Sequence, residues 1–123
     1  MPTKKKILII EDNPDISKTL RLRLKMEGYD TVTAKEGKQG LSLAKSEHPN
    51  LILLDLRLPD LPGEEICREL RKDPLYENLP IIMFTAKDTD TDKVIGRVIG
   101  ADYYMSKPFE MEKLLSRIHA LIG

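Results

Sequence analysis

The sequence of 123 residues predicts an α/β fold with an open parallel sheet of five strands and helices on both faces. Five short apolar runs alternate with segments of helical periodicity, and this alternation is typical of parallel sheets. The first and third runs are continuously apolar, as expected of strands that are covered on both faces. We predict strands at residues 7–10, 31–34, 51–54, 81–84 and 103–105.

End signals and periodicity place the helices between these strands. The first helix should begin at Asn13 and Pro14, a cap followed by proline at the first helical position, and end near Glu27. Apolar residues three or four positions apart predict the other four. These helices are expected at residues 37–47, 63–72, 91–99 and 110–122. Gly96 lies within the fourth, and such a glycine costs about 0.5–1 kcal/mol relative to alanine.

Composition excludes several classes of protein. Hydrophobic residues make up 41% and charged residues 33%, which is a globular composition. Twenty basic residues balance twenty acidic ones, so no net charge favours direct binding to nucleic acid or to a membrane surface. The single cysteine, Cys67, has no partner for an internal disulfide. We therefore expect a protein of the reducing cytoplasm.

Polar residues follow four of the five predicted strands. They are Glu11 and Asp12 after the first strand, Asp55 after the third, Thr85 after the fourth and Lys107 after the fifth. The carboxyl ends of parallel strands share one edge of the sheet, where ligands bind. Three adjacent carboxylates repel one another and require a cation, and oxygen ligands alone suit Mg²⁺. The sequence thus predicts a magnesium pocket with a hydroxyl and an ammonium group beside it.

Four segments resemble the receiver domains of bacterial two-component signalling. They read ILIIEDN at 7–13, LILLDLRLPDLPG at 51–63, IIMFTAK at 81–87 and GADYYMSKPF at 100–109. The resemblance implies a flavodoxin-like (βα)5 three-layer sandwich with strand order 2-1-3-4-5. It also implies one receiver domain over residues 1–123, without an output domain, that accepts a phosphoryl group from a histidine kinase or phosphotransfer protein.

Each site residue receives a role from this resemblance. Asp55 would be the phosphoacceptor and a metal ligand. Asp12 would bind Mg²⁺ directly, Glu11 would bind it through water, and Arg57 would contribute its backbone carbonyl; Mn²⁺ could replace Mg²⁺. The Thr85 hydroxyl would contact a phosphoryl oxygen.

The resemblance extends to the residues around the phosphoryl group. Lys107 would pair with the phosphoryl charge and precede a cis bond to Pro108. Tyr104 would be the aromatic switch residue, while Tyr103 should point to the opposite face. Arg57 and Lys87 occupy positions that modulate the rate of hydrolysis.

Signalling would pass through the face formed by the fourth helix, the fifth strand and the fifth helix. The downstream protein is unknown, and the unphosphorylated chain should be a monomer. DNA-binding members of the family form a charge-paired dimer there. At the positions of its two charge pairs, this chain would place Lys93 opposite Lys113 and Tyr103 opposite Arg117. Neither pair combines opposite charges. We therefore expect a different partner on this face.

The sequence also allows two alternative interpretations of its function. The chain could be a phosphorylation-independent interaction or dimerisation domain, but such domains usually lack one of the acids or the lysine. It could also be a receiver that belongs to a larger regulator or hybrid kinase. A metal-dependent phosphohydrolase fits poorly, because Arg57 stands where such enzymes carry a second acid.

Overall fold

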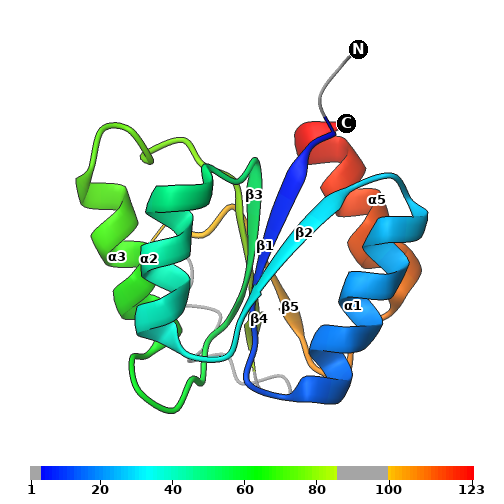
Figure 1. The fold of residues 1–123 in the computed structure, drawn as a ribbon, viewed down its shortest axis with the longest axis horizontal. Helices are drawn as coiled ribbons and strands as arrows, with labels where there is room; N and C mark the ends of the chain where they lie inside the picture. The colour runs from blue at the N-terminus through cyan, green and yellow to red at the C-terminus, as the bar shows by residue number, and fades with distance from the viewer. Residues whose placement is uncertain (1–3, 86–99) are drawn as a thin grey trace.

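The computed structural model describes residues 4–85 and 100–123, and a parallel sheet separates two layers of helices in it (Figure 1). The strands are β1 (Lys6–Ile10), β2 (Asp30–Ala34), β3 (Leu51–Asp55), β4 (Ile81–Thr85) and β5 (Tyr103–Ser106). Their order is β2-β1-β3-β4-β5, and every pairing is parallel. The predicted fold class and strand order are confirmed.

The helices cover both faces of the sheet. They are α1 (Pro14–Met26), α2 (Gly37–Glu47), α3 (Gly63–Lys72) and α5 (Met111–Ile122). Helices α1 and α5 lie on one face, and α2 and α3 lie on the other (Figure 1). The helix predicted at residues 91–99, with Gly96, lies outside the described residues. Among the helices of the described part, none has the length and apolar character needed to cross a membrane.

Strands β1, β3, β4 and β5 each contribute to two separate hydrophobic clusters, because successive side chains point to opposite faces. In β1, Leu8 and Ile10 pack into the cluster beneath α2 and α3. Ile7 and Ile9 pack into the cluster beneath α1 and α5. All four side chains are fully buried. The continuous apolar run of β1 is therefore explained by burial on both faces.

The first two helices begin in different ways. The predicted cap of α1 is confirmed, since Asn13 Oδ1 accepts hydrogen bonds from the backbone N–H groups of Asp15 (2.9 Å) and Ile16 (3.2 Å). Helix α2 receives no cap from its own N-cap side chain. Instead, the Asp60 carboxylate accepts from Gly37 N at 2.6 Å and Lys38 N at 3.0 Å. The loop after β3 therefore holds the start of α2.

Arg71 fixes the approach to β5. Its guanidinium donates to three backbone carbonyls and to the Asp102 carboxylate. The acceptors are Gly100 O (3.0 Å), Tyr76 O (2.9 Å), Leu79 O (2.8 Å) and Asp102 Oδ2 (3.0 Å). Asp102 also accepts from Ile81 N at 2.8 Å. One side chain thus joins the loop after α3 to the segment that leads into β5.

Candidate functional site

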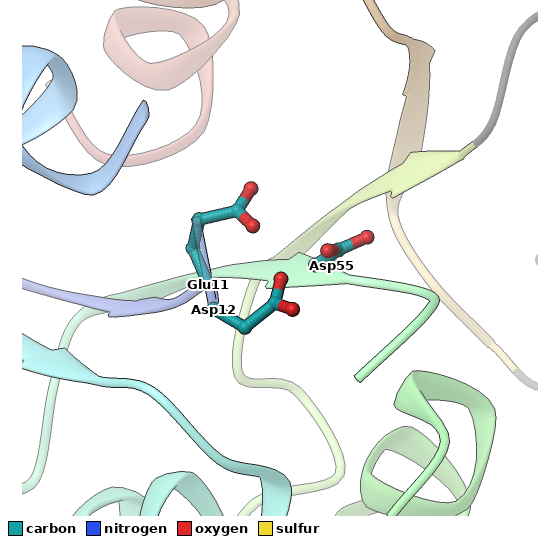
Figure 2. A group of neighbouring side chains, drawn as sticks. All are labelled: Glu11, Asp12 and Asp55. Carbon is teal, nitrogen blue, oxygen red and sulfur yellow. The ribbon is translucent and has the colours of Figure 1, made fainter. Parts of the chain in front are cut away.

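The acidic cluster lies at the carboxyl ends of β1 and β3, which are neighbours in the sheet. Ile10 pairs with Leu54, so the residues that follow them, Glu11 and Asp55, come side by side. Figure 2 shows the carboxylates of these residues and Asp12 grouped at this edge. One ligand oxygen from each of the three lies within 4.8 Å of the others.

Burial differs among the three carboxylates. Glu11 is 1% exposed and Asp55 is 7% exposed, whereas Asp12 is open to solvent. Placing charge in so buried a position is costly unless another charge compensates it. Three oxygen donors close together, one of them solvent-accessible, fit a hard divalent cation that keeps part of its water shell.

Lys107 supplies the compensating charge among the described residues. Its Nζ lies 2.5 Å from Glu11 Oε1 and 3.3 Å from Asp55 Oδ2. The peptide bond between Lys107 and Pro108 is cis, and Lys107 N donates to Thr85 O at 2.9 Å. The hydrogen bond to Thr85 O holds the backbone of Lys107 at the end of β4, and its side chain reaches the two carboxylates across the sheet edge.

The charges in this group influence one another. Burial of the Glu11 carboxyl, only partly offset by its hydrogen bond from Lys107, raises its pKa from 4.5 to about 7. Burial alone would lower the pKa of Lys107, but the hydrogen bond with Glu11 and the charge of Asp55 outweigh it and leave this pKa raised. Near neutral pH the site is therefore close to taking up or releasing a proton.

The backbone around Asp55 fixes the position of its carboxylate. Arg57 N donates to Asp55 Oδ1 at 3.1 Å, and Leu56 N donates to Phe84 O at 2.9 Å. Gly63 N donates back to Leu56 O at 2.9 Å. A Cβ atom at Gly63 would lie 2.5 Å from Asp55 O, closer than atoms can approach. Glycine therefore lets α3 begin directly against the backbone at the end of β3, where Asp55 lies.

The other predicted site residues have the following positions. Thr85 is 1% exposed, and its Oγ1 donates to Met105 O at 3.4 Å. Arg57 is exposed beside Asp55, while Lys87 lies outside the described residues. Tyr104 packs on the α2–α3 side of the sheet and Tyr103 on the α1–α5 side, as predicted. The centroids of their rings nevertheless lie 6.4 Å apart, with an interplanar angle of 19°.

A groove beside Lys107 was not predicted from the sequence. It has a volume of about 600 Å³ and lies between α1 and the segment that leads into α5. Its lining residues are Asp15, Ile16, Thr19, Leu20, Lys107, Pro108, Phe109 and Met111. Phe109 stacks on Phe84, with ring centroids 4.7 Å apart and an interplanar angle of 6°. In the sequence, the apolar residue Phe109 directly after Lys107 and Pro108 was the one feature that could have indicated this groove.

Comparisons with known proteins agree with this arrangement. The model of the response regulator receiver domain matches residues 7–119. The chain is 44% identical over 118 residues to the alkaline phosphatase synthesis transcriptional regulatory protein PhoP of Bacillus subtilis, covering 96% of this chain and 48% of that protein. The chain thus spans about half the length of the curated relatives it matches.

Solved structures show the same likeness. A putative response regulator from Chloroflexus aurantiacus matches with a TM-score of 0.92 and 31% identity, over 97% of this chain and 98% of that one. The receiver domain of the sensor histidine kinase PA1611 from Pseudomonas aeruginosa matches with a TM-score of 0.90 and 30% identity. This match covers 98% of this chain and 99% of that domain, which has a magnesium ion coordinated in its active site cleft.

Proposed function

Because this chain belongs to the response regulator receiver family, we propose that Asp55 is the residue on which it accepts a phosphoryl group. Members of this family are signalling phosphoacceptors of two-component systems and not classical enzymes. The observation that carries the assignment is the position of the Asp55 carboxylate, 3.3 Å from the Lys107 ammonium and grouped with two other carboxylates.

The transfer would proceed by attack of an Asp55 carboxylate oxygen on the phosphorus of a phosphohistidine. The new O–P bond forms as the P–N bond breaks, and the electron pair of that bond stays with the histidine nitrogen of the donor. Arg57 N, which donates to Oδ1, restricts the rotation of the carboxylate. Lys107 would move from Glu11 toward the phosphoryl oxygens, and Thr85 would donate its hydroxyl to one of them.

Glu11, Asp12, Asp55 and the backbone carbonyl of Arg57 would hold Mg²⁺. Their oxygen donors and the small separation of the carboxylates suit this ion. When bound, Mg²⁺ neutralises negative charge on the carboxylates and on the transferred group. The chain itself provides the nucleophile and the cationic side chain, so a small phosphoryl donor should suffice without a kinase.

The groove beside Lys107 is the proposed docking site for the histidine kinase or phosphotransfer protein. It is largely apolar, and Lys107 lines both the groove and the acidic cluster. A helix that lay in this groove could therefore present its phosphohistidine to Asp55. Ile16 and Met111 line the groove and are half-buried. Replacing either with an acid should weaken transfer from the protein donor but not from acetyl phosphate.

The signal would pass to a downstream protein from the side of the site formed by β5, opposite the proposed docking groove. Tyr104 lies on β5, where movement of Thr85 toward the phosphoryl group would leave space for an aromatic ring. We propose that a change at Tyr104 passes to a downstream protein on the surface of β5 and α5, in the cytoplasm. A module that works without phosphorylation is less compatible with the chain, since Asp55, Thr85 and Lys107 are all present.

Incubation with acetyl phosphate and Mg²⁺ tests the assignment. Intact-mass measurement should show one added phosphoryl group on the wild type and none on Asp55→Asn. Asp30→Asn, which alters an exposed carboxylate at the far end of β2, is the matched control and should be labelled normally. Removing the metal with a chelator should prevent labelling. Equal labelling of Asp55→Asn would refute the proposal.

A further inference from the structure

One edge of the sheet carries unused hydrogen-bonding groups. Among the described strands, β2 stands at the end of the sheet and pairs with β1 alone. Asp30 N donates to Lys5 O at 2.9 Å, and Ala34 O accepts from Glu11 N at 3.0 Å, so these residues direct their backbone groups toward β1. Because the direction alternates along a strand, Thr31 and Thr33 direct theirs outward. No hydrogen bond between described residues uses those outward groups.

Helix α1 lies alongside this edge of the sheet (Figure 1). Two hollows follow the gap between α1 and β2, with volumes of about 540 Å³ and 160 Å³. Arg21 lines both, so the hollows adjoin. Thr31 lies in the larger and Thr33 in the smaller. The exposed edge of β2 thus forms the floor of a groove of which α1 is one side. We call it the α1–β2 groove.

The α1–β2 groove is positively charged. Arg21 and Lys25 line the larger hollow, and Lys18 and Lys35 line the smaller one together with Arg21. No ion pair between residues of the described ranges includes any of these four side chains. By contrast, the acids Glu47 and Glu11 at this groove already pair with Lys6 and Lys107, which leaves Asp30 as its remaining acid.

The face of α1 that lines this groove differs from the face beside Lys107. Arg21 and Lys25 are four residues apart, so they lie on one side of the helix. Arg23 lies on another side and bonds to Glu112 of α5 at 2.5 Å. The basic residues of α1 therefore do not form one surface around the phosphorylation site. The presence of Arg21 and Lys25 beside β2 is therefore not explained by the phosphorylation site.

We propose that the α1–β2 groove binds an extended acidic segment of a partner protein as an added strand beside β2. The outward backbone groups of Thr31 and Thr33 would pair with the backbone of that segment. Its acidic side chains would alternate toward Arg21 and Lys25. Its intervening side chains would lie on the other face, beside the half-buried Val32, which packs on the α2–α3 cluster, and should be apolar.

A second copy of the chain fits this edge less well. Two β2 strands paired about a two-fold axis normal to the sheet would keep the same face upward. Both α1 helices would then lie on one face, near each other across the junction. Arg21 and Lys25 of one copy would face the same residues of the other, and like charges so placed repel. The charge of the groove thus favours an acidic partner over self-association.

A short, end-blocked peptide of alternating glutamate and valine is the probe, followed by fluorescence anisotropy. Binding should saturate and weaken with added salt, while a lysine–valine peptide should not bind. Arg21→Glu combined with Lys25→Glu should lower the affinity about tenfold or more. Lys45→Glu combined with Lys113→Glu makes the same change in net charge away from the groove and should leave the affinity unchanged. Equal loss in both double variants, or no saturable binding, would overturn the proposal.

Amide exchange separates strand addition from simple charge attraction. On binding to the wild type, the Thr31 and Thr33 amides should become protected. Thr33→Pro removes one outward N–H, a change that edge strands tolerate, and should abolish binding while phosphorylation by acetyl phosphate continues. Peptide binding that leaves both amides unprotected would refute an added strand. Sedimentation that shows the free chain dimerising through β2 would instead assign the edge to a second copy.

Discussion

Replacing Glu11 with glutamine should remove most of a pH dependence that the acidic pocket imposes on stability. The Glu11 carboxyl is 1% exposed, and burial is the main cause that raises its pKa from 4.5 to about 7. The folded state without metal therefore binds a proton more tightly than the unfolded state does. A raised pKa of an acid stabilises the folded protein at low pH, and this contribution is lost as the pH rises through about 7.

The size of the effect follows from the two values. Each pH unit between 4.5 and about 7 is worth about 1.4 kcal/mol, so the full contribution is on the order of 3 kcal/mol. Of this, roughly 2 kcal/mol should disappear between about pH 5.5 and about pH 8. The wild type should lose this stability relative to Glu11→Gln over that interval. Mg²⁺ should reduce the loss, because it binds the ionised site.

Urea denaturation without metal at the two pH values measures this difference. Glu36→Gln makes the same chemical change at an exposed position and should follow the wild type. The reasoning fails if the free energies of unfolding of Glu11→Gln and the wild type change by the same amount between the two pH values. That result would mean that the Glu11 carboxyl is already ionised at the lower pH.

Three further predictions concern other parts of the chain. Arg57→Asn combined with Lys87→Glu should speed the loss of the phosphoryl group, because two basic side chains no longer shield it from water; slower loss would contradict this. With beryllofluoride, sedimentation should show no charge-paired dimer, because Arg117 lies over the Tyr103 ring at 4.0 Å, where that dimer needs an acid. A two-fold dimer through β5 and α5 would refute this prediction. Arg71→Lys should lower the free energy of unfolding by roughly 1–3 kcal/mol, because lysine cannot reach all four acceptors at once. An unchanged midpoint of urea denaturation would refute this prediction.

The sequence predicted β1, β3 and β4 well because burial on both faces gives a continuous apolar run. β3 and β4 extend one residue beyond the predicted ends, to Asp55 and Thr85, since the polar residue still continues the ladder. The grouping of Glu11 and Asp55 followed from the parallel order alone. What could not be predicted is which carboxylate Lys107 contacts most closely, because that depends on how the side chains of three separate segments pack together.

Contacts between distant parts of the chain also escaped prediction. Asp60 caps a helix that begins 23 residues earlier, and nothing in the local sequence of α2 indicates its donor. The groove between α1 and β2 requires an edge strand and a helix face to meet. Periodicity describes each element separately, whereas these features depend on how two elements are placed relative to each other.

The capping of α2 by Asp60 bears on the order in which the protein assembles during synthesis. The first turn of α2 begins with Gly37 and includes Gly40, and glycine is a poor helix former. Residues 37–47 leave the ribosome before Asp60 does, so the helix emerges without the carboxylate that satisfies its first N–H groups. A nascent chain that ends just before residue 60 should therefore hold α2 only weakly. The first turn of α2 becomes stable only once the loop that carries Asp60 has also emerged.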